Sequence, residues 1–133
     1  MANFVSANLS HEISGSFVVF TLDAKLRFEP KEVGHRWLFQ IEFREQDPMK
    51  DDILSALPKA EAFGKADAHL KRHYFIPSKE EVELSFKEEF PAHLVDTELG
   101  KEEVYANVEA LPLEAPPGFV PAKTRTNITE VDV

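Results

Sequence analysis

Two long runs of alternating apolar and polar residues constrain the fold of this chain more than any other feature. Apolar side chains occupy every second position from Phe20 to Phe28, and the run from Trp37 to Phe43 repeats the pattern. Side chains on a β-strand point to opposite faces in turn, so each run has one apolar face and one mostly polar face. This pattern is typical of an antiparallel sheet that packs against another layer on one side only.

Shorter alternating segments predict further strands at residues 70–76, 82–86 and 104–110, and we also expect strands near residues 4–9 and 123–133. Turn-forming Gly and Pro separate about seven or eight such strands. The expected fold is therefore all-β: a single domain over residues 1–133, an antiparallel β-sandwich of immunoglobulin-like or related topology. A short helix is expected near residues 51–57, because two aspartates precede apolar residues and Pro58 would end the segment.

The inward faces of these strands should form one core between two sheets, supplied by eleven Phe, two Tyr and one Trp. The residues expected to be buried are Leu22, Leu26, Trp37, Phe39, Ile41, Leu84, Phe86 and Val108. Tyr74, Tyr105 and Phe119 are less constrained by the pattern. On a shared exposed face they would suit sugar stacking or a protein contact.

Composition narrows the classes of partner and chemistry. The chain has no cysteine, which excludes thiol nucleophiles and thiolate metal sites. Its net charge of −9 repels phosphate groups, so we expect no nucleic acid partner and no anionic membrane partner unless calcium bridges the two. The absence of a leader pattern or a long apolar segment leads us to expect a cytoplasmic protein, although a signal peptide removed earlier would leave no trace.

Two acidic clusters are the candidate metal ligands. They contain Asp47, Asp51 and Asp52 after the Trp37 strand, and Asp96 and Glu98 in a later turn. Calcium takes six to eight oxygen ligands, and loops at one end of a β-sandwich can collect them from separate segments. No D-x-D-x-D-G run is present, and a solvated acidic surface that keeps the domain soluble is the alternative interpretation. Calcium is the only cofactor that the sequence suggests.

Motifs for zinc binding and catalysis are weak. His69 and His73 lie in an alternating segment, where their Cα atoms would be roughly 13 Å apart, too far for one metal ion. No G-x-S-x-G motif surrounds any serine. A small hydrolase or isomerase whose residues converge only in space remains an alternative, and no catalytic residue is assigned.

The remaining expectation is a non-catalytic binding or assembly module, with a protein partner or a second copy of the chain. The acidic run from Glu80 to Glu89 is typical of a protected sheet border, whereas residues 124–133 carry few charges and no proline. This terminal segment is the predicted pairing edge, with side-chain contacts from Thr126, Ile128, Thr129 and Val131. The alternative is that this strand simply lies inside the sheet. A calcium-dependent binding domain using the acidic loops is a further possibility.

Overall fold

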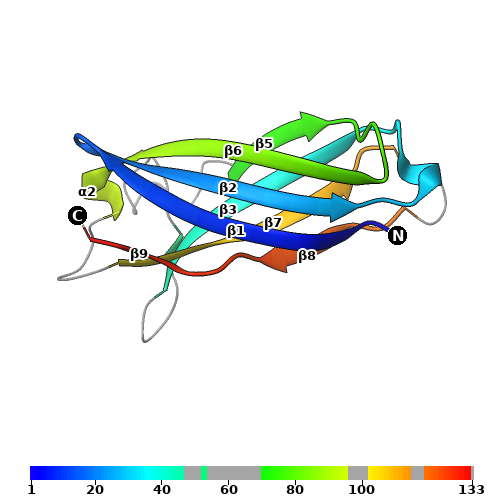
Figure 1. Ribbon diagram of the computed structural model, residues 1–133. Coiled ribbons are helices and arrows are strands. Elements are labelled where there is room, and N and C mark those ends of the chain that lie inside the picture. Colours follow the sequence, from blue (N-terminus) through cyan, green and yellow to red (C-terminus); the bar gives the residue numbers. More distant parts are fainter. Residues whose placement is uncertain (47–51, 54–69, 96–101, 115–118, 133) are drawn as a thin grey trace.

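The structure is a computed structural model that describes residues 1–46, 52–53, 70–95, 102–114 and 119–132. These residues form two antiparallel sheets that pack face to face (Figure 1). The smaller sheet has the strand order β1-β2-β6, with bounds β1 (Asn3–Ser14), β2 (Phe17–Arg27) and β6 (Glu81–Pro91). The larger sheet has β3 and β7 at its centre and shorter strands outside them, with bounds β3 (Trp37–Gln46), β4 (Asp52–Ile53), β5 (Leu70–Phe75), β7 (Glu102–Pro112), β8 (Ala122–Arg125) and β9 (Thr129–Val131).

The antiparallel β-sandwich predicted from the alternating runs is confirmed. The described residues contain eight strands of three or more residues, plus the two-residue strand β4. The short helix expected near residues 51–57 lies mostly outside the described residues, and the two residues described there pair with β3 as strand β4. Helical structure in the described part is confined to η1 (Pro30–Glu32) and α2 (Ala92–Val95), and none of it is long and apolar enough to span a membrane.

The first hairpin is longer than the sequence pattern predicted. Gly15 has a φ of 60°, a left-handed conformation that suits a tight turn, and it joins β1 to β2. The strand expected near residues 4–9 continues to Ser14, because it pairs with β2 along that strand's whole length. Cross-strand pairing therefore extends β1 beyond the part that alternates in sequence.

The core lies between the sheets where the alternation predicted it. Six of the eight predicted core residues are buried: Leu22, Leu26, Trp37, Phe39, Ile41 and Val108. Leu84 and Phe86 pack against the core but are only partly buried, because among the described residues β6 pairs with β2 alone. The position of β6 at a border agrees with the acidic run in its sequence.

The two long sides of the sandwich are closed differently (Figure 1). On one side, β1 lies against β8 and β9, and the Asn127 side chain hydrogen-bonds to the backbone of Leu9. On the other side, β5 of the larger sheet faces β6 of the smaller one. There, His73 stacks on Phe86 with ring centroids 4.0 Å apart, and its Nε2 lies 2.9 Å from a Glu88 carboxylate oxygen. Side chains alone join β5 to β6 in these contacts.

Candidate functional site

A strip of apolar side chains, exposed or half-buried, crosses three strands on the outer face of the larger sheet. Leu38 of β3 is in register with Tyr74 of β5 on one side and with Leu111 of β7 on the other. Leu38 points outward, because its neighbours Trp37 and Phe39 are buried in the core. Tyr74 is 74% exposed, and Leu38 and Leu111 are half-buried. We refer to Leu38, Tyr74 and Leu111 as the apolar strip.

Two more exposed apolar residues continue this surface toward the end of the sheet where β3 begins. Ile76 comes two positions after Tyr74 and is 59% exposed, and Leu113 comes two positions after Leu111 and is also exposed. The Gly34 N–H donates to the Pro77 carbonyl over 2.8 Å, which holds the segment after β5 beside the chain that leads into β3. Exposed apolar side chains grouped at one end of a sheet face are typical of interaction sites.

A row of polar side chains borders the apolar strip and crosses four strands. The Arg72 Nε–H donates to the Gln40 side-chain oxygen over 3.0 Å, and the Gln40 amide donates to Glu109 over 3.4 Å. Glu109 also pairs with the Lys123 ammonium at 3.0 Å. Beside this row lies a groove of about 500 Å³, lined by Gln40, Glu42, Asn107, Val108, Glu109, Lys123 and Thr124. The strip therefore has a polar border in which side chains are tied to one another.

Strand β5, which carries Tyr74 of the strip, forms an edge of the larger sheet in the described part of the chain. Within the described residues it pairs with β3 alone. Three consecutive residues of β5 are basic, namely Lys71, Arg72 and His73, and the strand contains no acidic residue. The Lys71 ammonium lies over the Phe90 ring, 5.8 Å from its centroid. This edge concentrates basic side chains in a chain with a net charge of −9.

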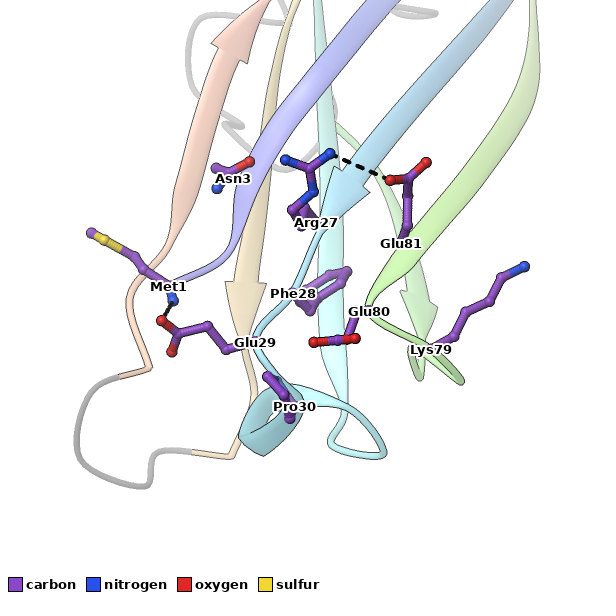
Figure 2. A pocket seen from close by; sticks show the side chains of 9 residues that line it. All are labelled: Met1, Asn3, Arg27, Phe28, Glu29, Pro30, Lys79, Glu80 and Glu81. Carbon is purple, nitrogen blue, oxygen red and sulfur yellow. Dashed lines mark hydrogen bonds and ion pairs between the residues drawn. The ribbon is translucent and has the colours of Figure 1, made fainter.

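Two other hollows are lined mainly by charged and polar groups, and some of these groups form ion pairs. The first, of about 660 Å³, lies where β1 begins and β2 ends, and Figure 2 shows Arg27 paired with Glu81 and the Met1 amine with Glu29 at its wall. The second, of about 590 Å³, lies on the outer face of the smaller sheet, where Lys25 pairs with Glu81 at 2.9 Å. This hydrogen bond raises the pKa of Lys25 and lowers the pKa of Glu81.

The predicted calcium ligands fall almost entirely beyond the described part of the chain. Asp47, Asp51, Asp96 and Glu98 lie outside the described residues, and of Asp52 only the backbone position in β4 is described. Among the described residues, no group of three or more His, Asp or Glu side chains could hold a metal ion. Calcium binding by the acidic loops stays a prediction.

The predicted interface residues lie on β9 and in the segment between β8 and β9, two strands that both pair with β7. Thr126 is buried, and its hydroxyl accepts a hydrogen bond from the Ala106 N–H and donates one to the Asn127 carbonyl. Val131 is buried in the core, and the Thr129 hydroxyl lies 2.6 Å from the His11 ring nitrogen. Ile128 is exposed. An intermolecular role for this segment stays a prediction, and Ile128 is the member whose side chain is well exposed.

Sequence reasoning singled out only one member of the apolar strip. Tyr74, Tyr105 and Phe119 do not share an exposed face, since Tyr105 is buried and Phe119 stacks on Trp37 with centroids 6.0 Å apart. A usable signal was present in β3, where Leu38 is an apolar residue among Gln40, Glu42 and Arg44 on the polar face. A single apolar residue on an outward face is common on protein surfaces, so this signal gains weight only from its strand neighbours, which could not be read from the sequence.

No family model matches the chain, and no curated protein is similar to it in sequence. Its fold is similar to part of a glycosyl hydrolase family 2 member from Bacteroides cellulosilyticus, with a TM-score of 0.55 and 8% identity, covering 98% of this chain and 15% of that one. The E. coli curli protein CsgC matches with a TM-score of 0.36 and 6% identity, over 90% of this chain and 95% of that one. R. palustris CsgH matches with a TM-score of 0.37 and 8% identity, over 92% of this chain and 90% of that one. The first likeness agrees with the β-sandwich fold, and this chain spans only about 15% of that protein's length.

Proposed function

We propose that this domain is a non-catalytic protein-binding module whose contact surface is the apolar strip of Leu38, Tyr74 and Leu111. The observation that carries the proposal is the register that places these three side chains next to one another on an outer sheet face. Burying apolar surface is the main favourable term in protein association, and a large exposed tyrosine is a frequent anchor in such interfaces. The polar row beside the strip would supply the rim.

The strand order supports a module of immunoglobulin-like type. The orders β1-β2-β6 and β3-β7-β8 correspond to the A-B-E and C-F-G arrangements of immunoglobulin-like sandwiches, and we propose this classification. In such sandwiches the interior is filled by side chains of both sheets, so binding uses loops or an outer face. The fold of this chain is similar to a 15% portion of a larger glycosyl hydrolase. This similarity is compatible with a sandwich domain that binds to other domains or proteins.

Selection from an unbiased peptide library displayed on phage tests the proposed function. Peptides are selected on the intact chain, and their binding is then measured on the variants Tyr74→Ser and Leu111→Ser. We expect the selected peptides to lose at least about tenfold in affinity on both variants, since each removes apolar contact area from the strip.

The matched control is Val19→Ser, which removes a half-buried apolar side chain from the outer face of the smaller sheet. Peptides that bind all three variants equally would show that the strip is not the binding surface. Circular dichroism of each variant confirms that the fold is retained, so that a loss of affinity reports on the contact itself.

A further inference from the structure

We infer that the partner of this surface is an extended, acidic segment of another protein, which adds as a strand to the outer edge of β5. This inference rests on the proposed function and names the chemistry of the partner. Adding a strand would extend the larger sheet and place the new side chains beside Tyr74 and Arg72. Main-chain hydrogen bonds supply affinity in this mode of recognition, and alternate side chains supply specificity.

β5 is the edge that the described fold leaves open to such pairing. It is six residues long, contains no proline, and pairs with β3 alone among the described residues. Among the described residues β6 pairs with β2 alone, and its side chains Glu81, Glu83, Glu88 and Glu89 would repel an acidic partner strand. On the opposite side of the sandwich, β1 lies against β8 and β9. There the Asn127 side chain hydrogen-bonds to both the N–H and the carbonyl of Leu9, so these groups cannot pair with an added strand. Within the described residues, an acidic strand would thus meet repulsion at β6 and an occupied edge at β1.

The charge of β5 favours an acidic partner strand. Lys71 and Arg72 are adjacent cations, while His73 already faces the Glu88 carboxylate of β6. Acidic residues outnumber basic residues in the chain as a whole. Among the described residues Lys71 contacts an aromatic ring and pairs with no carboxylate. Opposite charges on neighbouring strands attract, whereas antiparallel pairing of β5 with β5 of a second copy would bring basic residues together and would be destabilised. A second copy using this edge is therefore disfavoured.

The exposed side chains of β5 also indicate where apolar residues of the partner would lie. Tyr74 projects from the outer face of the sheet and is the most exposed of the large apolar residues described. A strand added beside β5 places one of its own side chains next to Tyr74, where aromatic and β-branched residues pair best. The expected partner segment therefore alternates acidic with β-branched residues.

The test uses a synthetic peptide of about eight residues, the length of an ordinary strand, in which Glu and Val alternate. Its binding to the intact, isotope-labelled chain is followed by the backbone amide signals in NMR. We expect saturable changes centred on β5, slower amide hydrogen exchange in residues 70–75, and weaker binding as salt is added. The same peptide with alternate backbone amides N-methylated should bind at least about tenfold more weakly, because the methyl groups remove the strand hydrogen bonds.

Charge variants supply the matched comparison. Lys71→Glu should weaken peptide binding at least about tenfold, whereas Lys87→Glu, the same charge change on the outer face of β6, should leave it within about twofold. Equal binding of a peptide with Lys in place of Glu, or an unchanged affinity after N-methylation, would overturn the inference. A further contrary result would be sedimentation of the chain alone as a dimer that the peptide cannot dissociate. That result would overturn the inference and assign the β5 edge to a second copy of the chain.

These outcomes separate the two proposals. Library peptides that depend on Tyr74 and Leu111 but carry no excess acid, or that bind as helices, would leave the proposed function intact and refute strand addition by an acidic segment. Library peptides that bind with no dependence on the strip would refute the proposed function itself.

Discussion

The side-chain amide of Asn127 hydrogen-bonds to both backbone polar groups of Leu9. Its Oδ1 accepts from the Leu9 N–H at 2.7 Å, and its Nδ2 donates to the Leu9 carbonyl at 2.9 Å. The amide side chain thus satisfies the backbone N–H and carbonyl of Leu9, which a neighbouring strand would otherwise pair with. It also links the two sheets along one side. The same residue begins an Asn-Ile-Thr sequon, and its amide is engaged within the fold.

Replacing Asn127 with Ala should destabilise the protein by about 1–3 kcal/mol, because two partly buried backbone groups lose their partner. Urea denaturation measures the change. Asn107→Ala is the control, since that amide makes one longer bond of 3.3 Å to Glu42 on the outer face of the larger sheet. Equal midpoints for the two variants would show that the Asn127 contacts contribute little.

Replacing Phe39 with Ala should lower the free energy of unfolding by about 3–5 kcal/mol, because it leaves a cavity in the core. The Phe39 ring is buried and lies 5.2 Å from Phe86 and 6.0 Å from Phe4, so the cavity would border both sheets. Leu38→Ala removes the neighbouring side chain on the outer face and should cost clearly less. Chemical denaturation of both variants checks the assignment of faces, and the opposite ranking would reverse it.

The two interpretations of the C-terminal segment make opposite predictions for a chain that lacks residues 124–133. This deletion removes the buried side chains of Thr126 and Val131 together with the Asn127 link to β1. We therefore expect a loss of the cooperative thermal transition, measured by circular dichroism. A truncated chain that remains folded while an oligomer of the full chain dissociates would instead support the interface predicted at Thr126, Ile128, Thr129 and Val131.

The ion pair between Lys25 and Glu81 should be visible in their titration. The hydrogen bond from Lys25 holds the pKa of Glu81 below 4.5, and the same bond raises the pKa of Lys25 above 10.5. The contribution of Glu81 to stability is present above its unfolded-state pKa and is lost as pH falls through its folded-state value. The contribution of Lys25 is present below its unfolded-state pKa and is lost as pH rises through its raised value.

Carboxyl carbon NMR measures the Glu81 midpoint directly. Lys25→Met should move that midpoint up toward 4.5, while Lys87→Met should leave it unchanged. A Glu81 midpoint that does not respond to Lys25→Met would show that the pair is broken in solution.

The net charge of −9 predicts no saturable binding to DNA, RNA or anionic vesicles at about physiological salt without added divalent cation. Fluorescence anisotropy with labelled nucleic acid and vesicle co-sedimentation measure this. Salt-sensitive, saturable binding without calcium would contradict the prediction, and loss of that binding in Lys71→Glu would locate it at β5.

The sequence alone determined the long central strands and their buried faces, because alternation is a local property with a period of two residues. The buried positions of Leu22, Phe39 and Val108 follow from it. The position of β6 at a border was predicted separately, from the run of acidic residues in its own sequence. The segment 124–133 has few charges and several β-branched residues. Such a composition fits an edge strand that pairs with a partner and equally fits a strand inside the sheet. Composition therefore could not decide where this segment lies.

Only the tertiary structure decided which residues meet across strands. Leu38, Tyr74 and Leu111 come from three distant segments and become neighbours through strand order and register. Asn127 reaches Leu9 only because β1 and the C-terminal strands line the same side of the sandwich. Register and strand order depend on the packing of both sheets and on connections between distant segments, so no local pattern of residues specifies them.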